Sequence, residues 1–134
     1  MRRVLVDTGA LLALVRERDT YHASVVRFLD EFRSGELLTT TPVLTETLHL
    51  LPAYLGFSVL AFTRPPQWRV LDVVEGLPRI SELLAKYADR PMDFADASLV
   101  WAAEQTDARE ILTTDQDFEI YRTRTQHRFE RVLL

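Results

Sequence analysis

The chain has 134 residues, of which 47% are hydrophobic and 27% charged, and this composition fits one folded domain rather than a disordered chain. It contains no cysteine, which excludes disulfides and thiolate metal sites, so any bound metal must use oxygen or imidazole ligands. The net charge of -4 argues against binding nucleic acid by bulk positive charge, although an acidic site that holds divalent cations still fits. Because no apolar run is long enough for a signal peptide or a membrane span, we expect a cytoplasmic protein that does not enter a membrane.

The first apolar run, residues 3–6, predicts a buried parallel strand that ends at Asp7. A helix follows over residues 10–15, and either Asp7 or Thr8 is placed to cap it. Ligands in open α/β sheets bind beyond the carboxyl ends of the strands, so Asp7 stands where a functional residue would stand. A plain helix cap explains the same residue equally well.

A second helix is expected over residues 20–32, and residues 37–40 predict a second strand. Pro42 occupies a favoured first helical position, and the helix that it opens carries Glu46 among apolar and small neighbours. A solvated surface glutamate is the commoner explanation of any single Glu. The apolar residues 57–62 that follow do not indicate one type of element over another.

The third strand is predicted over residues 68–74, with Asp72 inside it, and a helix is expected from Leu77 to Tyr87. Residues 92–103 then form a helix that is apolar almost all round, which is typical of an element buried on most sides. Its first turn carries two acids. Asp93 is placed as the N-cap, and Asp96 lies three residues later, where the helix dipole favours an anion.

The last part of the chain offers one further strand at residues 110–113, followed by Asp115 and Asp117. Here again an acid follows directly after a strand. The segment 121–131 is polar and basic, and residues 132–134 are a candidate final strand.

The alternation of short strands with helices predicts an α/β fold with a parallel central sheet of four to five strands flanked by helices. In such a sheet Asp7, Glu46, Asp96 and Asp115 all come to the same edge. Carboxylates brought together without a lysine or arginine repel one another, so the pattern indicates a cation that the chain does not supply. Oxygen-only ligands favour Mg²⁺ or Mn²⁺. Thr8 or Thr114 could position a water or a ligand carboxylate.

The four acidic blocks, in this order, resemble those of the PIN domain family, and more narrowly the VapC-type toxins of toxin–antitoxin pairs. The blocks are Val4-Leu5-Val6-Asp7-Thr8, Thr45-Glu46, Asp96-Ala97-Ser98-Leu99-Val100 and Leu112-Thr113-Thr114-Asp115-Gln116-Asp117-Phe118. The resemblance implies one PIN-like nuclease domain over residues 1–134. It also implies a Mg²⁺-dependent endoribonuclease, whose metal-binding acids are Asp7, Glu46, Asp96 and Asp115. Asp93 and Asp117 are further candidate ligands, and Asp117 competes with Asp115 for the fourth position.

A VapB-like antitoxin is the protein partner that the resemblance implies. The apolar helical segments 25–32 and 44–60 carry more hydrophobic side chains than one core stripe needs, which favours a homodimer or a groove for a partner helix. The candidate contacts to the RNA backbone are arginines: Arg64, Arg69, Arg122, Arg124 and Arg128.

Two other functions are compatible with the same pattern. One is an inactive PIN-like module that binds RNA or protein without cleaving it. The other is a phosphate-handling α/β domain of the receiver or phosphatase type, which also gathers acids at strand ends. That second class is less well matched, because the chain lacks a well-placed late lysine and has its acids in a different order.

Overall fold

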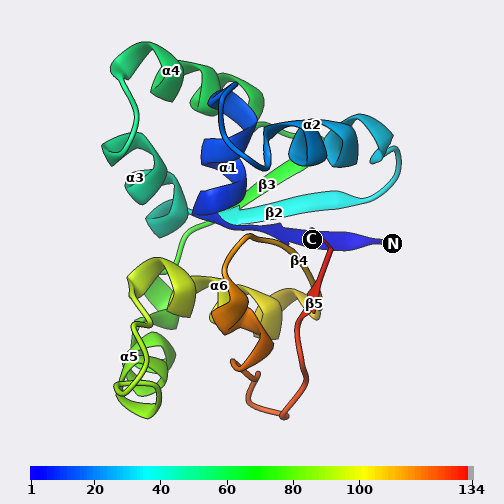
Figure 1. Cartoon of the computed structure of the whole chain (residues 1–134). Helices are drawn as coiled ribbons and strands as arrows, with labels where there is room; N and C mark the ends of the chain where they lie inside the picture. Colours follow the sequence, from blue (N-terminus) through cyan, green and yellow to red (C-terminus); the bar gives the residue numbers. More distant parts are fainter. Residues whose placement is uncertain (133–134) are drawn as a thin grey trace.

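Short apolar runs form the strands because their side chains are buried by helices on both faces of one sheet. The computed structural model describes residues 1–132, and Figure 1 shows the strands at the centre of the molecule. All neighbouring strands pair in parallel, in the order β3-β2-β1-β4-β5. The strands are β1 (Arg3–Val6), β2 (Glu36–Thr40), β3 (Trp68–Leu71), β4 (Glu110–Leu112) and β5 (Glu130–Arg131). The predicted α/β class with a parallel sheet is confirmed.

Six α-helices flank the sheet within residues 1–132. Figure 1 shows α1, α2 and α4 on one side of the sheet, and α5 and α6 on the other. None of these helices is long and apolar enough to cross a membrane. The helices are α1 (Thr8–Val15), α2 (His22–Glu31), α3 (Thr41–His49), α4 (Ala53–Phe62), α5 (Leu77–Lys86) and α6 (Phe94–Thr106).

Helix α6 is the most deeply buried helix, as its apolar sequence predicts. Ten of its 13 residues are buried, including three polar ones, Asp96, Ser98 and Thr106. The sheet lies on one side of it and α5 packs on another, where a Cβ on Gly76 would come within 2.4 Å of the Trp101 ring. A side chain at residue 76 would therefore displace Trp101 and the core around it.

The third strand is shorter than the sequence predicts. It ends at Leu71, because the Asp72 side chain accepts a hydrogen bond from Val74 N (2.9 Å) and starts a 3-10 turn at Val74–Gly76. Residues 57–62, whose type the sequence leaves open, belong to α4. The last strand that the structure describes is Glu130–Arg131, where Glu130 pairs with Glu110 on β4. Of the candidate strand 132–134, residues 133–134 lie outside the described part of the chain.

Candidate metal centre

Asp7 and Asp115 follow two neighbouring strands, β1 and β4, at the point where the strand order changes direction. Ligand sites of open α/β sheets lie at such points. One threonine holds both acids. The Thr113 hydroxyl donates to Oδ2 of Asp7 (2.8 Å) and accepts from the backbone N–H of Asp115 (2.9 Å). The other Asp7 oxygen accepts from Thr8 N (2.7 Å), so the carboxylate has a fixed orientation.

Asp96 reaches the same place from the first turn of α6. The predicted capping arrangement is present as a reciprocal pair: Asp93 accepts from Asp96 N (2.9 Å), and Asp96 accepts from Asp93 N (3.2 Å). The helix start is also tied to the sheet, because the hydroxyls of Thr40 and Ser98 lie 2.6 Å apart at the end of β2. Asp96 therefore points at the strand ends from a rigid support.

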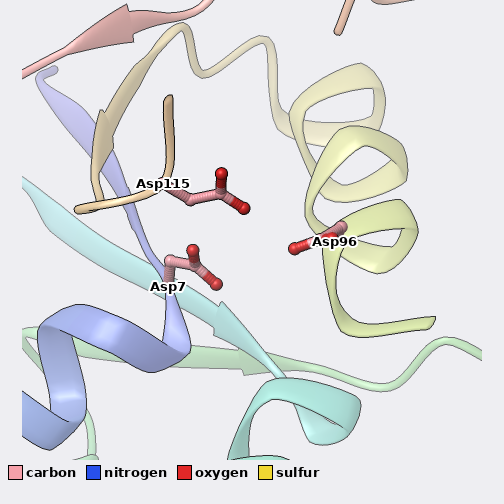
Figure 2. A group of neighbouring side chains, drawn as sticks. All are labelled: Asp7, Asp96 and Asp115. Carbon is pink, nitrogen blue, oxygen red and sulfur yellow. The ribbon is translucent and has the colours of Figure 1, made fainter. Parts of the chain in front are cut away.

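The three aspartates converge, as Figure 2 shows. One carboxylate oxygen from each of Asp7, Asp96 and Asp115 lies within 4.8 Å of the other two. A Mg²⁺ ion holds neighbouring oxygen ligands about 3 Å apart and opposite ones about 4.2 Å apart, since each Mg–O bond is about 2.1 Å. The three oxygens therefore face a common space close to the size of one such cation.

These acids have no basic partner in the part of the chain that the structure describes. None of the ion pairs within residues 1–132 includes Asp7, Asp96 or Asp115. Asp7 is 6% exposed and Asp96 is 8% exposed, so water screens their charges poorly.

Burial is the main reason that both carboxyl groups hold protons more tightly than usual. It raises the pKa of Asp7 to about 6, against the hydrogen bonds from Thr113 and Thr8, while the Asp115 charge adds to the rise. Burial and the neighbouring charges of Asp7 and Asp93 raise the pKa of Asp96 to about 8. Such a site lacks positive charge, and its all-oxygen donor set suits Mg²⁺ or Mn²⁺.

The other predicted acids lie around this group of three but outside it. Glu46, on α3, is half-buried, and burial together with the facing Asp93 carboxylate raises its pKa. Asp93 is exposed and serves as the N-cap of α6. Asp117 donates its backbone N–H to Oδ1 of Asp115 (2.9 Å), and its own carboxylate is not one of the three that converge.

Two residues at this site carry no sequence signal of their role. Thr113, rather than Thr8 or Thr114, orients the aspartates, whereas the buried Thr8 hydroxyl has no hydrogen-bond partner. Tyr121 is fully buried, and its hydroxyl also has no partner. Burial and then the charges of nearby acids, Asp96 first among them, raise the pKa of this phenol. A sequence gives no means of telling which threonine or tyrosine faces an acid.

The arginines predicted to contact RNA do not gather around the aspartates. Arg64 and Arg128 precede β3 and β5, which places them toward the amino ends of the strands. The Arg122 guanidinium donates to the carbonyls of Glu119 and Tyr121, and Arg124 pairs with Glu82 (3.1 Å). Any phosphate at the acidic edge would therefore be drawn there chiefly by a bound cation.

Comparisons with known proteins agree with this geometry. The family model of the PIN domain matches residues 4–123. The structure resembles VapC20 of Mycobacterium tuberculosis, a sarcin-ricin loop cleaving toxin, with a TM-score of 0.78 and 21% identity over 87% of this chain and 93% of that one. It also resembles FitAcB of Neisseria gonorrhoeae, with a TM-score of 0.57 and 18% identity over 84% of this chain and 87% of the other. The search of curated proteins gave no match. The match to the family model covers most of the sequence, and the chain therefore belongs to the PIN domain family.

Proposed function

We propose that this protein is a metal-dependent endoribonuclease that hydrolyses RNA phosphodiester bonds at the acidic edge of its sheet. The observation that carries this proposal is the convergence of three carboxylate oxygens, from Asp7, Asp96 and Asp115, to which no basic side chain among residues 1–132 is paired. We assign these three residues to metal binding, with Mg²⁺ as the expected ion and Mn²⁺ as a substitute.

When bound there, Mg²⁺ would supply a Lewis acid for the phosphate and would lower the pKa of a bound water. The chain's own groups hold the ligands in place: Thr113 fixes Asp7 and the loop of Asp115, and the capping box fixes Asp96. Glu46 lies beside the group of three, so we assign it a contact through water. Asp93 and Asp117 are further candidates for outer contacts. No histidine is required as a general base.

The biological role that we propose is the toxin of a VapBC-type toxin–antitoxin pair, acting on RNA in the cytoplasm. The likeness to VapC20, which cleaves the sarcin-ricin loop, supports this role. The expected partner is a VapB-like antitoxin. Charge supports such a partner, because a basic segment laid across the unpaired aspartates would neutralise them.

We also propose that the protein forms a homodimer through α4. Tyr54, Phe57 and Leu60 lie one helical turn apart and are 69%, 70% and 47% exposed, so they form an apolar stripe without a partner within the described chain. The apolar residues of α2 are used differently, because Phe28 and Leu29 pack against the core. Sedimentation of Phe57→Lys beside wild type tests this proposal, and a dimeric variant would contradict it.

The nuclease proposal is tested by cleavage of single-stranded RNA with Mg²⁺, with EDTA, and by the variant Asp96→Asn. We expect the wild type to cleave only with the metal. We expect Asp96→Asn to lose about 10³-fold in rate, the size of effect that follows removal of one charge-stabilising group from an active site. Asp89→Asn, an exposed acid in the loop before α6, is the matched control and should keep full activity.

Two results would contradict this assignment. Full activity in Asp96→Asn would show that the group of three aspartates does not take part in the cleavage of RNA. A wild type that binds RNA without cleaving it, and that takes up no Mn²⁺ in a calorimetric titration, would identify the chain as an inactive binding module.

A further inference from the structure

A cavity of about 460 Å³ lies next to the aspartate group, between α3 and the start of α6. Pockets of roughly 300 to 1,000 Å³ hold small organic molecules, and this one has room for a single planar ring system. It shares two side chains with the acidic edge, Glu46 and Asp93. Asp93 is bonded to Asp96 through the capping box, so the cavity opens directly beside the proposed metal site.

One wall of this cavity is apolar and includes an aromatic ring. Phe94, Pro42 and Val73 contribute to it. Phe94 is 45% exposed, although it is the first residue of the helix that is otherwise the most deeply buried. An aromatic face left open to solvent beside a nuclease site is the kind of surface on which a nucleic acid base stacks.

Two carboxylates, of Glu46 and Asp93, lie on the polar side of the cavity, and when ionised these only accept hydrogen bonds. The Thr45 hydroxyl already donates to Thr41 O (3.0 Å), which leaves it free only to accept. The His49 imidazole also lines the cavity and can donate a hydrogen bond. The two carboxylates would repel a phosphate, whereas they would accept from the N–H groups of a neutral ligand, and the imidazole would serve an acceptor on it.

We propose that this cavity binds one base of the RNA, adjacent to the scissile phosphate, and that it prefers bases with an exocyclic amino group to uracil. Guanine, adenine and cytosine each present such a donor, and a carboxylate accepts from it. The base would stack on Phe94, with its edge toward Glu46, Asp93 and Thr45. This inference rests on the proposed nuclease function. It adds that the nuclease prefers RNA sequences with guanine, adenine or cytosine at the position bound in the cavity.

Nucleoside 5′-monophosphates test the cavity without any cleavage, because they contain no phosphodiester bond. Their common phosphate is expected at the metal site while the base varies. Calorimetry with Mg²⁺ and the full chain would compare GMP, AMP and CMP with UMP. We expect the three amino-bearing nucleotides to bind about tenfold more tightly than UMP, the discrimination that a well-made base contact provides.

Variants of Phe94 test the stacking. Phe94→Ala should weaken binding of the amino-bearing nucleotides by about tenfold, and Phe94→Tyr should restore it. Tyr21→Ala, at an exposed aromatic residue before α2, is the control and should bind as wild type does. Unfolding curves of each variant establish that it is folded, and the exposure of Phe94 makes this the expected result.

The outcomes of these experiments distinguish a failure of the base site from a failure of the proposed nuclease function. If the wild type cleaves RNA but binds all four nucleotides equally, or if Phe94→Ala changes nothing, the cavity is not a base site. A basic segment of a partner protein would then be its occupant. If base-dependent binding that requires Phe94 is found in a protein that does not cleave RNA, the base site stands and the nuclease proposal fails.

Discussion

An acidic side chain lies near each end of α6, and the two acids differ in whether a basic side chain is paired with them. Near the amino end, Asp96 accepts a backbone hydrogen bond from Asp93 N, but its charged neighbours are other carboxylates, and its pKa rises to about 8, chiefly through burial. Eight residues later, Glu104 accepts two hydrogen bonds from Arg79 (2.9 and 2.7 Å) and a third from the backbone N–H of Arg124 (2.6 Å). Within residues 1–132, the same helix thus carries one acid without a basic partner and one that is paired with an arginine.

This difference separates an acid that is paired within the fold from one that we assign to the proposed metal site. Glu104 bonds Arg79 on α5 and the backbone of Arg124, so it holds α5, α6 and the segment after residue 121 together and stabilises the folded protein. Asp96 lowers stability, because a buried carboxylate near Asp7 is costly to ionise. The fixed orientation of this group nevertheless agrees with the cation site that we propose. Four predictions measure the contrast.

Breaking the paired end has the largest expected effect on stability. Glu104→Gln leaves the mostly buried Arg79 without its counter-charge, and we expect the free energy of unfolding to fall by about 3 kcal/mol. Urea denaturation measures this loss. Glu82→Gln is the matched control, because Glu82 contacts the same Arg79 at 3.8 Å but is exposed, and it should lose less than about 1 kcal/mol. Equal losses in the two variants would show that burial does not distinguish these pairs.

Removing the charge at the other end should have the opposite sign. Asp96→Asn keeps an acceptor for Asp93 N and removes a carboxyl group that must bind a proton when the protein folds near neutral pH, so we expect the metal-free protein to gain on the order of 2 kcal/mol there. Urea denaturation in EDTA measures the gain. Excess Mg²⁺ should stabilise the wild type and leave Asp96→Asn almost unchanged. A variant that is less stable than wild type in EDTA would mean that Asp96 is a structural acid like Glu104.

The threonine that supports the aspartates is predicted to act on metal affinity. Thr113→Val removes the donor to Asp7 and the acceptor for Asp115 N, so we expect Mg²⁺ binding to weaken by about tenfold. Thr106→Val is the matched control at the far end of α6, where the hydroxyl likewise donates to one backbone group (Ala102 O, 2.7 Å) and accepts from another (Ala108 N, 3.4 Å). Calorimetry should find its Mg²⁺ affinity unchanged. If both variants lose affinity equally, the effect is one of general stability.

The sequence predicts the fold class well because its signals are local. Residues 4–6 are apolar with a valine at either end, and they lie in the central strand. The capping pair of Asp93 and Asp96 is visible as spacing alone, and the structure contains it. Strand ends are less well predicted, since the end of β3 depends on the side chain of Asp72 bonding to Val74 N.

The candidate site likewise has features that the sequence predicts and features that it does not. The meeting of Asp7, Asp96 and Asp115 follows from strand order and helix spacing, both of which a sequence pattern carries. Which of Asp115 and Asp117 turns inward is decided by the turn after β4, where Asp115 accepts from Asp117 N. The orientation by Thr113 and the open ring of Phe94 depend on side chains that meet across long separations in the chain. No local pattern encodes such meetings.

The smallest predicted effect is the dependence of metal-free stability on pH. In the folded protein the pKa is about 6 for Asp7 and about 8 for Asp96, whereas an aspartate in the unfolded chain has a pKa of about 3.8. At pH values above 3.8 and up to about 8, the folded state therefore binds more protons than the unfolded state. The free energy of unfolding must then decrease as the pH rises. From about pH 6 to about pH 8, where Asp96 dominates, we expect a loss of about 1 kcal/mol per pH unit in EDTA.

Two changes should remove that slope for different reasons. Asp96→Asn deletes the group that titrates, so its stability should be nearly flat over the same range. Saturating Mg²⁺ should flatten the slope of the wild type, because the metal-bound carboxylates are deprotonated, as those of the unfolded state are over this pH range. Urea denaturation across the range measures both. A wild-type slope that stays the same with Mg²⁺ would mean that the ion does not bind at Asp96, and the contrast between the two ends of α6 would then lose its functional meaning.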